Sequence, residues 1–323
     1  MLIQVSPADV ASCRYAISPL FEVDSALRLI TGHGTVGVLG PWVRRMRPLL
    51  GDLRRAEPAI GALISLFRRE DNADFLHPPP SGPRRSFADE LAEVRATPLD
   101  RARAELELNL RGHRAPPAYA RRILDGDDVV DRLADALQAG WTTLVEPDWP
   151  RMRALLERDI VQRAGRVAAY GWAEGLEGLD PRVTWTAGGD IAIRHRDTKR
   201  YRLVGGGLLF VAGVFTGLAI STHPDRPFTV AYRARGIADI IGPPPAGPHG
   251  DGLGPLIGPG RAAILRALAA PATTSQLAAQ LGMSLGGVGG HLAVLHRAGL
   301  VARARTGRSV LYALTARGES LAG

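Results

Sequence analysis

Arginine is concentrated at the end of this chain. From Pro259 to Gly323 there are seven arginines and one carboxylate, Glu319, so this segment carries +6 of the formal net charge of +8. The rest of the chain is almost neutral, with 33 basic and 31 acidic side chains. Guanidinium groups bind phosphate through forked hydrogen bonds. A compact basic segment beside a large neutral region indicates a nucleic-acid-binding module under the control of another domain.

The basic segment has the sequence pattern of a winged helix. Apolar spacing predicts a first helix over Arg261–Ala269 and a second that begins at the hydroxyls of Thr273-Thr274 and ends at Gly282. Ser284 can cap a third helix that ends at Gly299. Strands over 300–305 and 309–314 would form a hairpin. The third helix of such a fold enters the major groove, and the hairpin forms the wing.

The side chains expected to contact DNA lie at the start of the second helix, early in the third helix and in the wing. The wing arginines would reach phosphate or the minor groove. The predicted contact residues are Thr274, Ser275, Gln276, Ser284, Leu285, Gly286, Gly287, Gly290, His291, Arg303, Arg305, Thr306 and Arg308.

Three stretches of this segment resemble the ArsR/SmtB-type winged helix-turn-helix regulators: TTSQLAAQLGMS (273–284), VGGHLAVLHRAGLV (288–301) and RTGRSVLYALT (305–315). Upstream, ISPLFEV (17–23) and GGGLLFVAGVF (205–215) look like an uncharacterised N-terminal domain fused to such regulators in actinobacteria. The resemblance implies a DNA-binding transcriptional regulator, and for the N-terminal domain it implies no known chemistry.

Two features depart from that family. Its metal sensors use paired cysteines or His/Asp sets, whereas the single cysteine here, Cys13, is remote, and His291 and His296 do not share a helix face. We therefore expect no metal site of the family kind and no cofactor. The second departure is glycine at 286, 287, 289 and 290. Three interpretations are open: the helix is only partly formed without DNA, the glycines allow the backbone to approach DNA closely, or the recognition helix has lost its ability to read bases.

The upstream pattern predicts an α+β fold. Residues 1–241 read as a regulatory or dimerisation domain that is helical to about residue 180 and has a small antiparallel sheet over about 181–241. In this pattern, residues 2–5 read as a short edge strand, and Gly188-Gly189 as a hairpin turn. Residues 242–258 are rich in glycine and proline and read as a linker, and 259–323 form the winged helix.

Residues 203–222 contain no ionisable side chain, so their composition resembles that of a membrane-spanning helix. Gly205-Gly206-Gly207 and the β-branched residues favour the alternative of two buried strands around a turn. We therefore expect no membrane association. The N-terminus lacks a secretory signal, and one cysteine suits a reducing compartment, so we expect a cytoplasmic, nucleoid-associated protein.

The sequence contains no recognisable set of catalytic residues. The run from Gly32 to Gly37 matches GxGxxG, but a predicted helix precedes it and Pro41 follows it, so it reads as a helix-to-helix loop. Six histidines outside the basic segment, His33 and His77 among them, lack ligand spacing and read as surface or core residues. Glu90, Glu93, Glu105 and Glu107 lie among arginines and read as solvated ion pairs. We expect no catalytic residues.

The sequence thus predicts a sequence-specific regulator acting on double-stranded DNA, which we expect to be a homodimeric repressor. The N-terminal domain would dimerise, sense a small-molecule effector, or both. The effector-binding residues are unknown; the pocket is expected where the helical part meets the sheet, around Trp185 and Gly206–Val214. The alternative is an enzyme or protein-interaction module that uses the winged helix as a targeting part.

Overall fold

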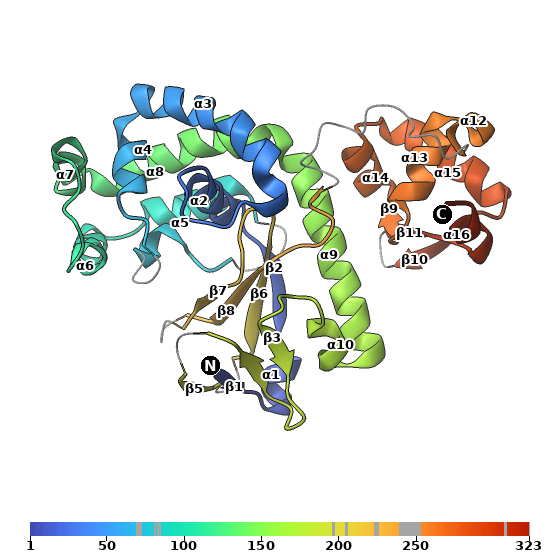
Figure 1. Cartoon of the computed structure of the whole chain (residues 1–323), viewed down its shortest axis with the longest axis horizontal. Helices are drawn as coiled ribbons and strands as arrows, with labels where there is room; N and C mark the ends of the chain where they lie inside the picture. Colours follow the sequence, from blue (N-terminus) through green and yellow to red (C-terminus); the bar gives the residue numbers. More distant parts are fainter. Residues whose placement is uncertain are drawn as a thin grey trace. The chain divides into compact units, whose positions relative to one another are not determined.

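The computed structural model describes residues 1–68, 73–80, 82, 85–195, 198–203, 206–222, 226–238, 253–306 and 309–322. The chain divides into two compact units. The first comprises Met1–Trp149 and Arg166–Ala234, and the second comprises Pro150–Gly165 and Arg235–Gly323. The long helix α9 (Trp149–Tyr170) therefore contributes residues to both (Figure 1).

Helices make up most of the first unit before residue 177. The prediction that the chain is mostly helical to about residue 180 is confirmed. The helices are α1 (Pro7–Ala11), α2 (Pro19–Ile30), α3 (Gly40–Ala56), α4 (Pro58–Ile64), α5 (Phe87–Arg95), α6 (Leu99–Leu110), α7 (Ala118–Leu124), α8 (Val129–Gly140) and α10 (Trp172–Leu176), with short turns η1 (Gly37–Leu39), η2 (Asp74–Leu76), η3 (Trp141–Val145) and η4 (Glu146–Asp148).

Helix α2 is buried on almost every side. Ser18 caps it by accepting a hydrogen bond from the amide of Phe21 at 3.0 Å, and Pro19 occupies its first turn. Leu20, Val23 and Leu27 are at most 1% exposed, as their helical spacing predicts. Helices α3, α5 and α8 gather around α2 (Figure 1). Its polar residues Glu22, Asp24 and Ser25 are also buried, and a buried charge needs a partner.

The first unit has two four-stranded sheets, in the orders β3-β4-β1-β5 and β2-β6-β8-β7. In the second of these sheets, β2, β6 and β8 are parallel, and β7 is antiparallel to β8. Strand β6 is buried along its whole length, as expected for a central parallel strand. The strands are β1 (Leu2–Gln4), β2 (Arg14–Ile17), β3 (Val183–Trp185), β4 (Ile191–Ile193), β5 (Arg200–Arg202), β6 (Leu208–Gly213), β7 (Ala219–Ser221) and β8 (Phe228–Arg233).

The α+β class is confirmed, but the strand pairing differs from the expected single antiparallel sheet. Both sheets are mixed, because β1 pairs in parallel with β5 and β2 pairs in parallel with β6. Strand β1 lies between β4 and β5 rather than at an edge. Alternation of apolar and polar residues identifies a strand but not the strand with which it pairs. Strands β5 and β6 lie far along the chain from β1 and β2.

The apolar stretch 203–222 forms strands, as the glycines and β-branched residues predicted. Its described part contains β6 and β7. Within the described residues, no helix has the length and apolar character that crossing a membrane requires.

The second unit contains the predicted winged helix. Its elements are α12 (Leu253–Ile257), α13 (Pro259–Ala267), β9 (Ala272–Thr273), α14 (Thr274–Leu281), α15 (Leu285–Arg297), β10 (Val301–Thr306), β11 (Ser309–Leu314) and α16 (Ala316–Ala322). Strands β10 and β11 form the wing hairpin, and β9 pairs with β11. Helix α12 occupies the end of the predicted linker 242–258, and the rest of that segment to residue 252 lies outside the described residues.

Candidate functional site

Helices α14 and α15 are joined by a tight turn with capped ends. Thr273 and Gln276 form a reciprocal capping box: the Thr273 amide donates to Gln276 Oε1 at 2.8 Å, and the Gln276 amide donates to Thr273 Oγ1 at 3.3 Å. Gly282 ends α14 with φ at 65°. Ser284 Oγ then accepts the amide of Gly287 at 3.1 Å and caps α15. These local contacts fix the angle between the two helices.

Helix α15 has one buried face and one exposed face. The exposed face is called the bare face here, because three of its four residues have no side chain beyond Cβ. Val288, Leu292 and Leu295 are at most 1% exposed and pack in the core of the winged helix. The opposite face is a stripe of exposed residues at spacings of four, three and four: Gly286, Gly290, Ala293 and Arg297. The sequence prediction included Gly286 and Gly290 but missed Ala293 and Arg297, which the same helical spacing would have found.

The wing presents two arginines. Arg303 and Arg305 are both exposed on β10, opposite Tyr312 and Val310 of β11. Alternate residues of a strand share a face, so the two guanidinium groups lie on the same side of the hairpin. Thr306 is the last residue of β10. Arg308, also predicted to contact DNA, lies outside the described residues.

The other predicted contact residues occupy the start of α14 and of α15. Ser275 is exposed in the first turn of α14, and Thr274 is half-buried beside it. The Gln276 side chain is engaged in the capping box, with its oxygen on the Thr273 amide. Leu285 is 58% exposed at the first position of α15. Their contacts with DNA stay a prediction.

His291 lies beside α13. A Cβ atom added to Gly260 would be 2.8 Å from His291 Nε2, so the imidazole occupies the space next to that glycine. The residue is half-buried. The sequence prediction assigned His291 to DNA; its ring in fact packs against the neighbouring helix, and the predicted base contact is untested.

The glycines of α15 leave open space. A Cβ atom added at Gly286, Gly289 or Gly290 would meet no atom within 4 Å, whereas one at Gly287 would lie 3.1 Å from Ser284 Oγ. Packing therefore does not require glycine at these three positions. All four glycines are helical in this structure.

A family described as a helix-turn-helix domain matches residues 258–304. The match spans α13, β9, α14, α15 and the first part of the wing. The C-terminal part of the chain therefore contains a helix-turn-helix domain, a kind of domain that binds DNA. No curated protein and no solved structure matches the chain.

The first unit contains a cavity of about 690 Å³ between α2 and the sheet β2-β6-β8-β7. Its walls come from α2, the loop 32–35, the segment 74–80 and strands β6 to β8. Val211 of β6 lines it, but Trp185, which we expected at such a pocket, does not and lies in β3 of the other sheet.

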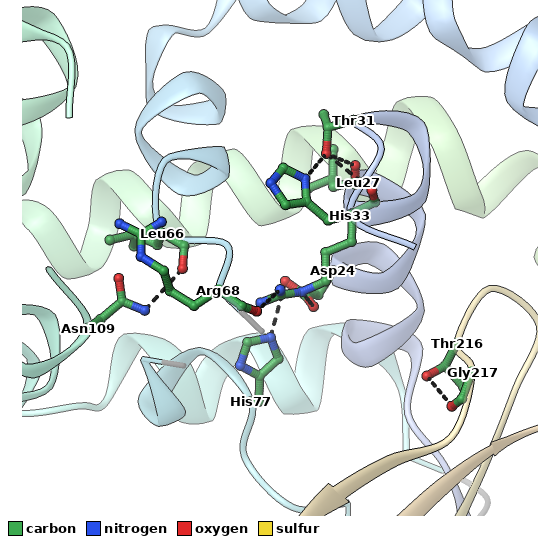
Figure 2. A network of polar contacts seen from close by, with 11 residues as sticks. Asp24, Leu27, Thr31, His33, Leu66, Arg68, His77, Asn109, Thr216 and Gly217 are labelled. Carbon is green, nitrogen blue, oxygen red and sulfur yellow. Dashed lines mark hydrogen bonds and ion pairs between the residues drawn. The ribbon is translucent and has the colours of Figure 1, made fainter. Parts of the chain in front are cut away.

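Asp24 is the buried carboxylate of this cavity, with a side chain 4% exposed. Its Oδ2 accepts a hydrogen bond from Arg28 Nε at 2.6 Å, and its Oδ1 lies 3.2 Å from His77 Nε2 (Figure 2). Burial opposes ionisation, but the charges and hydrogen bonds of His77 and Arg28 outweigh it and lower the pKa of Asp24 to about 2.

His33 and His77 reach this cavity from separate segments, as Figure 2 shows. The sequence analysis interpreted both histidines as surface or core residues. The residues around each histidine do not indicate that tertiary packing brings both to one cavity. The GxGxxG run is a helix-to-helix loop as predicted, and its Gly32, His33 and Gly34 line the cavity.

Metal ligands do not cluster in the part of the chain that the structure describes: no group of three or more His, Cys, Asp or Glu side chains could hold an ion there.

The prediction that Glu90 belongs to a solvated ion pair is wrong. Glu90 is 1% exposed. Its Oε2 accepts hydrogen bonds from Ser18 Oγ and from the amide of Leu20, both at 2.9 Å, so it supports the start of α2. Burial raises the pKa of Glu90 to about 7.

Proposed function

We propose that the protein is a sequence-specific transcriptional regulator of the ArsR/SmtB type that acts as a homodimeric repressor in the cytoplasm, on DNA of the nucleoid. The observation that supports this best is the bare face of α15 together with the arginines of the wing. The bare face and Arg303 belong to the segment that matches the helix-turn-helix family, and Arg305 follows it directly. Residues 259–323 carry +6 of the formal net charge of +8.

The bare face suits close approach to DNA. Gly286, Gly290 and Ala293 have no side chain beyond Cβ, so the α15 backbone can enter the major groove more deeply than a helix with long side chains. Arg303 and Arg305 supply phosphate or minor-groove contacts beside it. Few side chains then read base edges, so sequence preference depends on those few contacts and on DNA shape.

The first unit supplies control in this proposal. Two-fold operators require two winged helices at a fixed spacing, and the N-terminal domain is large enough to provide a dimer interface. It also contains the cavity described above. A bound effector would act by favouring one arrangement of the two winged helices over another.

An enzyme with a targeting winged helix is the second candidate, and the Asp24–His77 pair favours it. A carboxylate that orients an imidazole is a common catalytic arrangement. In the described residues, the hydrogen bonds and ion pairs of the His77 ring join it to Asp24 alone, without a hydroxyl or thiol nucleophile. We therefore propose that the cavity binds a ligand and performs no catalysis.

Selection of bound sequences from a random double-stranded DNA library tests this function. The full chain should enrich a two-fold symmetric motif, and reporter expression from a promoter that contains the motif should fall when the protein is present. A double variant, R303A/R305A, serves as the matched control and should enrich the same motif much less strongly, because it binds all DNA sequences more weakly. Equal enrichment by the full chain and this variant, or no enrichment by either, would contradict the proposal.

A further inference from the structure

Positive groups outnumber negative groups in the cavity of the first unit. Arg28, Arg68 and Arg226 line it, together with two histidines, whereas Asp24 and Asp74 are the aspartates of its wall. The cavity lies between α2 and a sheet, so the electric field of these groups is less screened than at an open surface.

Asp24 is fully engaged and cannot neutralise the other cations. One of its oxygens accepts from Arg28 and the other from His77. Arg226 donates Nη1 to the carbonyl groups of Asp74 and His77, at 2.8 and 3.0 Å, so its charge meets dipoles there rather than a carboxylate. The cavity therefore has unbalanced positive charge.

Arg28 is held in one orientation. Its Nε is bound to Asp24, its Nη1 donates to the Arg68 carbonyl at 2.9 Å, and its Cζ lies 4.4 Å from the centre of the Phe67 ring. Its side chain is 18% exposed. A guanidinium fixed in advance loses little conformational entropy when it binds an anion.

The neighbouring basic groups repel one another. Burial and then the charges of Arg28 and Arg68 lower the pKa of His33, and burial followed by the charge of Arg28 lowers the pKa of Arg68. An anion between these groups would relieve that repulsion, and a cation would increase it.

The remaining walls are apolar or bear hydroxyl groups. Phe21 and the strand residues Val211, Ile220 and Ala231 give one side an apolar surface, and Ser221 and Thr229 add hydroxyls. A volume of about 690 Å³ accommodates a molecule much larger than an inorganic ion. Pockets for small organic ligands combine these features: an apolar wall and a few fixed polar groups.

We propose that this cavity binds a small organic anion, whose carboxylate or phosphate group lies beside Arg28 and His33 and whose apolar body lies against Phe21 and strands β6 to β8. The anion would be the effector of the regulator. That regulatory role rests on the proposed function, whereas binding of the anion to the first unit does not.

Calorimetric titration of the full chain tests the binding. The probes are phenylbutyrate, octanoate and phenyl phosphate, with phenylbutyramide as the uncharged counterpart, phenethylamine as a cation and inorganic phosphate as an anion without an apolar body. We expect saturable binding of at least one organic anion, at least tenfold tighter than its neutral counterpart, the cation and inorganic phosphate. Carboxylate and phosphate probes distinguish the two possible head groups.

Variants locate the site. R28Q should weaken binding of the anion at least tenfold, because the positive charge beside the head group is lost. A219W, on β7 at the cavity wall, should block binding while leaving the Arg28 contacts intact, which keeps the test valid if R28Q fails to fold. R95Q removes an exposed arginine paired with Asp131 and Asp135 and should bind the anion normally.

Binding that A219W leaves unchanged, preferential binding of phenethylamine that D24N abolishes, or no saturable binding of any organic anion would overturn the proposal. DNA titration with and without the bound anion then addresses regulation separately. Failure of the cavity leaves DNA binding by the full chain intact. Failure of the DNA-binding function leaves anion binding and its loss in A219W intact, so the two failures are distinguishable.

Discussion

Asp24, Glu22 and Glu90 are all buried in the first unit, yet the pKa of Asp24 differs from those of the two glutamates because their partners differ. Asp24 faces a guanidinium and an imidazole, and its pKa is lowered to about 2. Glu22 accepts hydrogen bonds from the amides of Val214 and Phe215, at 2.6 and 3.1 Å, but burial dominates and raises its pKa to about 7. The two amide dipoles and the charge of Arg233 compensate Glu22 less well than the hydrogen-bonded guanidinium and imidazole compensate Asp24.

These pKa values predict opposite pH effects on stability. Asp24 stabilises the fold above its unfolded pKa of about 3.8, and this contribution is lost as pH falls toward 2. Glu90 binds its proton more tightly in the folded state than in the unfolded state, so its effect on the free energy of unfolding is to lower it as pH rises from about 4.5 to about 7.

Glu90→Gln should remove that second effect. Glutamine can still accept the hydrogen bonds of Ser18 and Leu20, and its amide group replaces Oε1, which has no hydrogen-bond partner among the described residues. The free energy of unfolding of E90Q minus that of the unchanged protein should increase by roughly 1–3 kcal/mol from about pH 5 to about pH 8. Urea unfolding at both pH values measures it.

The matched control is Glu93→Gln on the same helix. Glu93 is 48% exposed and pairs with Arg85, and an exposed pair contributes little to stability. E93Q should therefore leave the pH profile unchanged. Parallel pH profiles for E90Q and the unchanged protein would show that Glu90 has the same pKa in the folded and unfolded states.

The wing arginines predict a change in salt dependence. Each phosphate contact contributes about one unit to the slope of log affinity against log salt concentration. Replacing Arg303 or Arg305 by alanine should therefore reduce the slope by about one unit each and weaken binding similarly on all DNA sequences. Titration of one DNA duplex at four salt concentrations measures the slope. An unchanged slope in both variants would mean that the wing does not touch the DNA backbone.

At the scale of elements, the sequence predicted what is encoded locally. The helices α13, α14 and α15 follow from apolar spacing and from the caps at Thr273 and Ser284, which act within three residues. Strand β2 was missed because its four residues, Arg14–Ile17, show no alternation of polar and apolar side chains. Its partner β6 lies almost 200 residues further on. A pocket between the helical part and the sheet was predicted, and Val211 lines the cavity, but the contributions of α2, His77 and β8 were not predicted because these segments meet only through tertiary packing.

Helix α15 should tolerate side chains at its glycines. Because Gly289 and Gly290 have open space around them, Gly289→Ala and Gly290→Ala should each stabilise the helix by about 1 kcal/mol. Thermal unfolding of the double variant measures the gain. Gly282→Ala is the control: its φ of 65° disfavours alanine, so this variant should lose stability. If the double variant is no more stable, α15 is not limited by its glycines.

DNA affinity of the two single variants separates two roles of the glycines. A methyl group added at Gly290 would project from the bare face, whereas one added at Gly289 would lie beside that face. If close backbone approach matters, G290A should weaken DNA binding more than G289A, although both stabilise the helix. Equal affinity of both variants for the preferred DNA would indicate that the helix does not approach DNA at this face.

For the whole molecule, charge and core are divided between the two units. The winged helix has its own apolar core, which among the described residues is formed by side chains from Ile257 to Leu321. It carries most of the net positive charge, and the rest of the chain is nearly neutral. A domain with its own core can fold alone, so the winged helix and the N-terminal domain should have separable tasks, phosphate binding for one and assembly for the other.

This division predicts the behaviour of the isolated winged helix, residues 253–323. It should be monomeric and bind DNA weakly, because a single module makes half of the contacts of a two-fold complex. The full chain should be dimeric and bind the same duplex much more tightly, since joining two modules makes the second binding event intramolecular. Sedimentation and DNA titration of both proteins measure these properties. A dimeric winged helix with the affinity of the full chain would place the dimer interface in the winged helix and remove this role from the N-terminal domain.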